Sequence, residues 1–294
     1  MKILYIGCVK SSKVFLKAIL DNTNAEIIGI VTKVNSNYNA DHEPLNEIAE
    51  EYGIDWIDYK NPQQLVDWTH LKQPDIIYCF GWSHLLPKEV FKYPKLGAIG
   101  YHPTLLPKNR GRHPIIWTIV LGLKETGSTF FYLDEKPDSG DIISQEIVKV
   151  DEYETASSLY EKLLRVGKKQ IIQVTKDLMN QEFKRTKQDE SQATYWRKRS
   201  KSDGLIDWRM SAKSIFRLVN ALSKPYVGAH FVYNDSEIKV WKAEILSDVE
   251  IESNIEPGKI VSVDKNSFTV KTGDSYIRVI DYEGDFVPKK GDYL

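Results

Sequence analysis

The sequence predicts an α/β protein: an N-terminal doubly wound, mostly parallel sheet followed by a small C-terminal antiparallel β-barrel. Three observations predict this fold class. In the first half, apolar runs alternate with helical patterns, the order of a parallel sheet covered by helices. Those runs are almost continuously apolar, as strands buried on both faces should be. In roughly the last seventy residues, short β-rich runs alternate with Gly, Asn and Asp turns, which is typical of a barrel.

The elements of the first part follow in chain order. Strands are expected at the apolar runs Ile3–Ile6, Ile27–Val31, Ile54–Ile57, Asp75–Phe80 and Ala98–Tyr101. Helices are expected between them, over Ser11–Leu20, Pro44–Glu51 and Pro62–His70. A further helix, Pro114–Leu121, starts with a proline, which helices tolerate in the first turn. Extended segments follow at Ser128–Leu133 and Ile142–Val148, and Thr155 is expected to cap a long helix.

The texture of the chain changes after this helix. Residues from Phe183 to Gly204 are polar and lack periodicity, so we interpret them as a surface linker. A short helix is expected at Ala212–Leu222. The β-rich runs of the last part are His230–Tyr233, Ile238–Trp241, Lys259–Val263, Ser267–Lys271 and Tyr276–Val279. We therefore predict a first domain over residues 1–182, a linker over 183–204 and an OB-like barrel over 205–294.

Composition narrows the function classes. The 294 residues include 40 Lys and Arg against 41 Asp and Glu, so no global field attracts nucleic acid or an anionic membrane. The two cysteines, Cys8 and Cys79, are too few for a disulfide framework or a zinc site and are expected to be reduced. No apolar run approaches the length of a membrane helix. We therefore expect a cytoplasmic protein with no membrane partner.

Common ligand motifs of α/β domains are missing. The first strand ends at a single glycine, Gly7, without the G-x-G-x-x-G loop of dinucleotide-binding domains, and there is no Walker A sequence. No G-x-S-x-G elbow is found, which disfavours serine hydrolase chemistry. The six histidines are scattered without an H-x-x-x-H pair, so we expect no metal.

One strand-like run ends at a titratable side chain. Ala98–Tyr101 leads straight into His102 and then into a loop rich in Pro, Gly and Arg. Open α/β sheets bind ligands beyond the carboxyl ends of their strands. Asp138 lies in a turn between two later strand-like runs. A lone histidine would more often be a core side chain, but a histidine and a carboxylate within folding reach are the minimum for general acid–base catalysis. Both are candidate catalytic residues.

Three blocks of sequence carry a family pattern. The first, His102–Gly111, reads H-P-T-L-L-P-K-N-R-G and is similar to H-x-S-L-L-P-x-x-R-G. The second joins T-G-S-T at Thr126–Thr129 to D-S-G-D-I-I at Asp138–Ile143, similar to T-G-V-T and D-x-G-x-I. The third pairs Asp207–Trp208 with K-P-Y-V-G-A at Lys224–Ala229, similar to I-D-W and P-x-P-G-A. In this order they resemble the formyltransferases that use 10-formyltetrahydrofolate, which act on methionyl-tRNA or on amino sugars.

The resemblance implies an Asn–His–Asp catalytic trio. His102 and Asp138 match two of its members, but the position of the asparagine holds Gly100. The family's asparagine amide is thought to stabilise the oxyanion that forms when an amine attacks the formyl carbon. Losing one such donor costs roughly a hundredfold in rate. Candidate replacements are Asn109, in the loop after the strand, backbone N–H groups, or protonated His102.

The resemblance also implies a formyl donor site, with 10-formyltetrahydrofolate and no metal. The pterin ring is expected beside the segment that joins a strand to the next helix. The residues assigned to this site are Phe80, Gly81, Trp82, Leu85, Leu86, Pro87 and Asp141. A glycine beside apolar groups at the end of a strand suits a flat heterocycle.

The acceptor amine is the remaining question. Residues 205–294 hold 12 Lys and Arg against 14 Asp and Glu, a net charge of −2 that argues against RNA. The R-G-R sequence at Arg110–Arg112 is similar to the formyltransferase domain of the bifunctional polymyxin-resistance enzyme, and a guanidinium fork suits a diphosphate. We therefore expect a UDP- or TDP-linked 4-amino-6-deoxy sugar of surface-polysaccharide or nonulosonic-acid biosynthesis. Its expected contacts are Thr104, Arg110, Arg112, Tyr195, Arg197 and Tyr226.

Two alternatives stay open. The first is a methionyl-tRNA formyltransferase, and the second is a non-catalytic relative that kept the fold after Gly100 replaced asparagine. The apolar strands of the C-terminal domain are also compatible with a homodimer.

Overall fold

The computed structural model describes residues 1–36, 40–246, 249, 250, 252 and 254–294. The chain divides into two compact units that interleave along the sequence. The first unit consists of Met1–Pro114, Thr126–Val148 and Glu161–Trp196. The second unit consists of Ile115–Glu125, Lys149–Tyr160 and Arg197–Leu294. The segment expected to be a linker over 183–204 is thus shared between them, and its first part belongs to the compact first unit.

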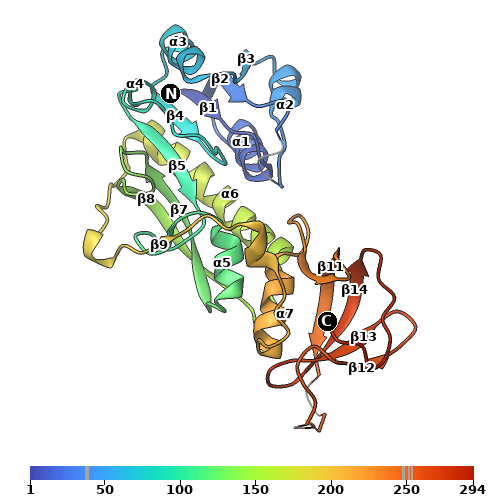
Figure 1. The fold of residues 1–294 in the computed structure, drawn as a ribbon. Coiled ribbons are helices and arrows are strands. Elements are labelled where there is room, and N and C mark those ends of the chain that lie inside the picture. The colour runs from blue at the N-terminus through green and yellow to red at the C-terminus, as the bar shows by residue number, and fades with distance from the viewer. Residues whose placement is uncertain (37–39, 247–248, 251, 253) are drawn as a thin grey trace. The chain divides into compact units, whose positions relative to one another are not determined.

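A mostly parallel sheet forms the centre of the first unit (Figure 1). Its strands lie in the order β3-β2-β1-β4-β5-β7-β8. Their bounds are β1 Lys2–Ile6, β2 Glu26–Thr32, β3 Trp56–Asp58, β4 Ile76–Cys79, β5 Ala98–His102, β7 Glu125–Tyr132 and β8 Ile142–Lys149. The pairs from β3 to β5 are parallel, and β5 pairs antiparallel with β7. The predicted fold class is confirmed.

Helices cover both faces of this sheet. In the first unit these are α1 Lys10–Asn22, α2 Asn46–Glu51, α3 Pro62–Lys72, α4 Lys88–Phe91 and most of α6 Ala156–Asn180, whereas α5 Pro114–Val120 belongs to the second unit from Ile115 on. On one face, Phe15 of α1 contacts the rings of Phe80, Tyr101 and Phe130. The same face meets α6, where Thr175 hydrogen-bonds the Tyr78 hydroxyl at 3.1 Å. On the other face, α3 and α4 pack on a separate apolar cluster of strand residues.

The second unit contains an antiparallel sheet with the strand order β10-β11-β14-β13-β12. Its elements are α7 Ala212–Ala221, β10 Ala229–Tyr233, β11 Ser236–Ile245, β12 Ile260–Val263, β13 Phe268–Lys271 and β14 Tyr276–Glu283. Trp208, Phe231, Phe268 and Phe286 stack edge to face in its core. This agrees with the antiparallel β structure predicted for the last part of the chain, and its closure into an OB-like barrel stays a prediction.

Two further predictions concern the state of the cysteines and the presence of membrane-spanning helices. Cys8 and Cys79 are both free and buried, and burial raises the pKa of the Cys8 thiol to about 11. Both thiols are therefore core side chains, and burial favours their protonated form over the thiolate. Among the helices that the structure describes, none is long and apolar enough to cross a membrane.

The aromatic face of the sheet yields a stability prediction. Phe15 is fully buried between three rings, so Phe15→Ala should leave a cavity and lower the free energy of unfolding by about 3–5 kcal/mol. Urea unfolding followed by circular dichroism measures this. Leu71→Ala is the control, since Leu71 is 70% exposed and should change stability by less than about 0.5 kcal/mol. Equal losses in both variants would contradict the packing described here.

The second unit should lose stability in mild acid. Burial lowers the pKa of His230 on β10 below its ordinary value of 6.5. Below that ordinary value the unfolded chain binds a proton that the folded chain does not, so stability falls as the pH drops from 6.5 toward the folded-state pKa. Thermal unfolding at pH 7.5 and 5.5 measures the difference, which His230→Gln should reduce. If His230→Gln keeps the pH dependence of thermal stability seen in the wild type, that dependence arises from other titratable groups.

Candidate active site

His102 is the last residue of β5 and is almost buried, at 6% exposure. Its Nε2 lies 2.9 Å from the backbone carbonyl oxygen of Asn109. A carbonyl can only accept, so this contact assigns the proton of the neutral ring to Nε2. The other ring nitrogen, Nδ1, lies 3.9 Å from Asp138 Oδ2, beyond direct hydrogen-bond distance. Nδ1 is therefore the ring nitrogen that can accept a proton.

Asp138 occupies a sharp turn between β7 and β8. Its φ of 57° lies in the left-handed region, which Asp tolerates better than most residues. Its Oδ2 accepts a hydrogen bond of 2.9 Å from the backbone N–H of Gly111. That bond ties the carboxylate to the loop that follows β5, so the structure brings the two predicted catalytic residues together. Their catalytic roles stay predictions.

Asn109 is built into the same loop. Its φ of 63° is again left-handed. Its backbone N–H donates to Thr194 Oγ1 at 2.8 Å, and its side-chain oxygen accepts from the same hydroxyl at 3.2 Å. These bonds hold its carbonyl in place under His102. A role for its side chain as the oxyanion donor stays a prediction.

Gly100 has no room for a side chain. A Cβ at this position would lie 2.7 Å from Leu133 Cδ2 and 3.1 Å from Phe131 Cζ. The space in which the family carries asparagine is thus filled by two apolar side chains. Any donor to an oxyanion must therefore come from another part of the site.

The predicted donor segment follows β4. Phe80 is fully buried among aromatic rings, and its backbone N–H and carbonyl bond to the Ile6 carbonyl and the Ser12 hydroxyl, so it supports the segment and has no free donor for a ligand. Gly81 has a φ of 61°, and a Cβ there would lie 2.0 Å from Val9 Cγ2. The half-buried Trp82 packs on Tyr59, and its buried Nε1–H has no hydrogen-bond partner among the described residues. An unsatisfied donor beside the expected pterin position fits a ligand with acceptor atoms.

The other donor-site residues differ in exposure. Leu85 is 82% exposed, whereas Leu86 packs against the apolar cluster under α3 and α4. Pro87 directly precedes α4. The backbone carbonyl of Asp141 accepts a hydrogen bond of 2.8 Å from the Tyr132 N–H. The side chain of Asp141 is partly exposed at the turn.

Two of the predicted acceptor contacts prove to be structural groups. The Arg110 side chain is fully buried and donates to Gln188, Glu190 and Tyr195. Thr104 is also fully buried, and its hydroxyl donates to the Lys108 carbonyl at 3.0 Å. This geometry favours a role inside the loop for both.

The remaining predicted contacts lie in both units. Tyr195 is 63% exposed. Arg112 lies in the loop after β5, and its backbone N–H donates a hydrogen bond to the Trp196 carbonyl. Arg197 and Tyr226 belong to the second unit, where Arg197 pairs with Asp203. Gln188 and Thr194 could not be found from the sequence, because polar residues in a stretch without periodicity give no sign of burial.

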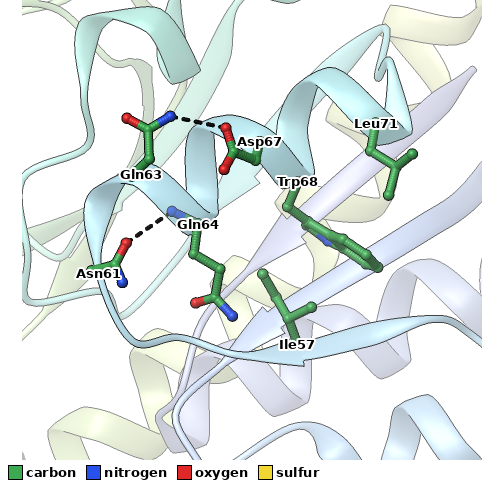
Figure 2. Close-up of a pocket in the computed structure, with 7 residues that line it drawn as sticks. All are labelled: Ile57, Asn61, Gln63, Gln64, Asp67, Trp68 and Leu71. Carbon is green, nitrogen blue, oxygen red and sulfur yellow. Dashed lines mark hydrogen bonds between the residues drawn. The ribbon is translucent and has the colours of Figure 1, made fainter.

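A pocket of about 480 Å³ lies on a different part of the first unit, along α3 and β3 (Figure 2). None of the predicted site residues lines it. Its polar side chains are hydrogen-bonded within the protein: Asn61 caps α3 through the Gln64 N–H, and Gln63 donates to Asp67, both at 2.9 Å. The Gln64 amide donates to the Asp58 carbonyl at 3.3 Å and accepts from the Lys60 N–H at 2.8 Å. We interpret it as a helix surface. In the part of the chain that the structure describes, no group of three His, Cys, Asp or Glu residues is arranged to hold a metal.

Comparison with known proteins identifies the family. Residues 1–175 match the model of the formyl transferase domain, and residues 198–284 match that of the formyl transferase C-terminal domain. The chain therefore belongs to the formyl transferase family. The predicted formyltransferase activity and the predicted donor of this family, 10-formyltetrahydrofolate, are confirmed with it.

Individual relatives extend this finding. Methionyl-tRNA formyltransferase of Clostridioides difficile (strain 630) is 32% identical over 285 residues, which covers 95% of this chain and 91% of the relative. An N-formyltransferase from Helicobacter canadensis, solved with folinic acid and dTDP-3-aminofucose, has a TM-score of 0.72 and 19% identity, covering 96% of this chain and 100% of that one. HypX from Aquifex aeolicus, solved with tetrahydrofolic acid, has a TM-score of 0.70 and 18% identity, covering 95% and 43%. These two structures share the fold.

The predicted acceptor, a nucleotide-linked amino sugar, is wrong. Curated relatives at 29–34% identity, most of them over nearly the whole chain, are methionyl-tRNA formyltransferases, whereas the sugar enzyme of known structure shares only the fold. The prediction relied on the net charge of −2 over residues 205–294 and on the two arginines of the R-G-R sequence. Arg110, the first of them, is fully buried and hydrogen-bonded inside the protein, so it is not available to bind a diphosphate.

The tight turn at Gly81 predicts an effect on donor binding. Gly81→Ala adds a Cβ that collides with Val9, so the loop should shift and binding of folinic acid should weaken at least tenfold. Gly53→Ala is the matched control, because Gly53 has a similar φ of 64° but nothing within 4 Å of its Cβ position. Titration calorimetry measures both. Equal affinity for folinic acid in the two variants would show that this loop is not part of the donor site.

Proposed function

We propose that this protein is a methionyl-tRNA formyltransferase, which transfers the formyl group of 10-formyltetrahydrofolate to the amino group of methionyl-tRNA. The observation that carries the proposal is similarity to enzymes of that name over 95% of the chain, at 32% identity. Similarity over both units supports a shared substrate more strongly than a match to the catalytic unit alone. The acceptor places the proposed reaction in the cytoplasm.

The geometry of His102 and Asp138 supports the chemistry. A primary amine must lose a proton as its nitrogen bonds to the formyl carbon and the bond from that carbon to the donor nitrogen breaks. The distance between His102 Nδ1 and Asp138 Oδ2 is 3.9 Å. One amine nitrogen placed between them can donate a hydrogen bond of about 2.9 Å to each atom. The amine proton passes to Nδ1 and from there to the leaving nitrogen. Asp138 then lies beside the imidazolium and stabilises it.

The Nε2 contact gives this base a fixed orientation. Because the Nε2 proton is donated to the Asn109 carbonyl, the ring cannot rotate to exchange its two nitrogens without losing that bond. Positioning of both reactants supplies much of the remaining acceleration.

Charge is compatible with an RNA acceptor once it is considered locally. Residues 205–294 carry a net charge of −2, but residues 183–204 hold seven Lys and Arg against three Asp and Glu. Phosphate contacts depend on such local clusters and not on the net charge of a domain. Part of this cluster is partnered, since Arg197 pairs with Asp203 and the Arg199 guanidinium lies 4.8 Å from the Trp117 ring centre.

The test is a formylation assay with 10-formyltetrahydrofolate and methionyl-tRNA. His102→Ala should lower kcat by at least a hundredfold, because general acid–base catalysis contributes 10²–10⁴. Asp138→Asn keeps the shape but removes the charge beside the imidazolium, and should lower kcat in the same direction. His70→Ala, on α3 and exposed, is the histidine control and should leave kcat unchanged.

Each result bears on the proposal. Turnover that is lost in His102→Ala and kept in His70→Ala supports it. Binding of folinic acid without turnover of methionyl-tRNA would refute it in favour of a non-catalytic relative.

A further inference from the structure

A fully buried guanidinium, that of Arg110, lies next to the catalytic loop. Its Nε and Nη2 donate to Gln188 Oε1 at 3.2 and 2.7 Å. Its Nη1 and Nη2 donate to the two carboxylate oxygens of Glu190 at 3.1 and 2.6 Å, and Nη1 also donates to the Tyr195 hydroxyl at 2.8 Å. A buried charge is tolerated only when it is satisfied in this way. The network therefore has a defined geometry.

Gln188 connects this guanidinium to the turn that carries Asp138. Gln188 is 5% exposed, and its oxygen faces Arg110. Its Nε2 donates to two backbone carbonyls of the turn, those of Asp138 at 2.9 Å and Gly140 at 2.7 Å. A single amide thus accepts from the loop after β5 on one side and holds the Asp138 turn on the other.

The same segment also holds the loop under His102. Thr194 accepts the N–H of Asn109 through its hydroxyl and the N–H of Arg110 through its carbonyl, at 2.8 and 2.9 Å. Strand β9 (Tyr195–Trp196) pairs in parallel with β6 (Arg110–Gly111). Asn109 in turn accepts from His102 Nε2. Residues 188–196 therefore fix the surroundings of both members of the His102–Asp138 pair.

We propose that Gln188 is a positioning residue for formyl transfer, which sets the place of the Asp138 carboxylate relative to His102, with Arg110 as its anchor. The inference rests on the proposed function for its chemical consequence. His102 and Asp138 make no direct hydrogen bond, so their separation is fixed by the backbone that carries them. A displacement of about 1 Å in such a site can cost a hundredfold in rate.

Gln188→Glu tests this with little change in shape. The carboxylate keeps an acceptor for Arg110 but replaces the donor that faces the carbonyls of Asp138 and Gly140, and so releases the turn. We expect kcat to fall at least tenfold with the KM values for both substrates changed less than twofold. Gln170→Glu is the matched control: Gln170 is 6% exposed, and its Nε2 donates to the Ser128 carbonyl at 3.0 Å and to the Ser144 hydroxyl at 2.9 Å, on β7 and β8, and not to the carbonyls of the Asp138 turn. It should lose stability without the loss of kcat.

A second readout does not need an acceptor. The ¹⁵N imidazole signals of His102, assigned by their loss in His102→Ala, report its tautomer and surroundings. They should shift in Gln188→Glu and remain in place in Gln170→Glu. If Gln188→Glu does not fold, Glu190→Ala takes its place, since it removes two bonds of Arg110 at a half-exposed side chain; kcat should then fall two- to fivefold at unchanged KM.

The outcomes separate the two proposals. A wild-type protein that does not formylate methionyl-tRNA refutes the proposed function, while the His102 signals still test the positioning role. Unchanged kcat and unchanged His102 signals in Gln188→Glu would overturn the inference. So would a parallel loss of kcat in Gln188→Glu and Gln170→Glu that follows their loss of stability.

Discussion

The hydrogen bond from His102 Nε2 to the Asn109 carbonyl determines what the rest of the site can do. It engages Nε2 of the ring, so that the other ring nitrogen, Nδ1, is the one that lies near Asp138. This arrangement includes unusual backbone geometry, because Asn109 and Asp138 both adopt the left-handed backbone conformation without being glycine. Such conformations persist only where the surroundings hold them. Here the surroundings are the Gly111 N–H, which binds the carboxylate, and the residues 188–196 that support the loop.

The buried Arg110 explains why a polar, aperiodic segment is part of a compact unit. A guanidinium removed from water needs acceptors, and residues 188–195 supply a glutamine, a carboxylate and a phenol oxygen. The interaction with Arg110 also holds the pKa of Glu190 below its ordinary value, so that the pair stays ionised at neutral pH. Removing Glu190 would deprive a buried guanidinium of two hydrogen bonds, which is the costly case for a buried charge, whereas the half-exposed Glu190 carboxylate can be hydrated.

Much of the fold could be predicted from the sequence, and the reason is periodicity. Runs such as Ile76–Cys79 are apolar because both faces of the strand are covered, and that pattern is local. The proximity of His102 and Asp138 could also be predicted, since each ends or follows a strand and lies in a recognisable motif, while their roles stay predictions. Gln188 was not, because its burial depends on Arg110, 78 positions away. The acceptor was predicted wrongly for the same reason: an arginine in a loop looks solvent-exposed until its partners are known.

Gly100 remains the departure with the largest chemical consequence. Its Cβ position is occupied by Leu133 and Phe131, so the loss of asparagine is accompanied by a packed apolar wall and not by an empty space. An oxyanion donor of this kind contributes roughly two to three orders of magnitude in rate. Acid–base catalysis and positioning contribute separately, and the residues proposed to supply them, His102 and Asp138, lie 3.9 Å apart with their supporting hydrogen bonds formed. A site that has lost one of three contributions while keeping the others ordered should be slow and not inactive. Restoring asparagine would require the Leu133 side chain to move, because its Cδ2 lies 2.7 Å from the Cβ position.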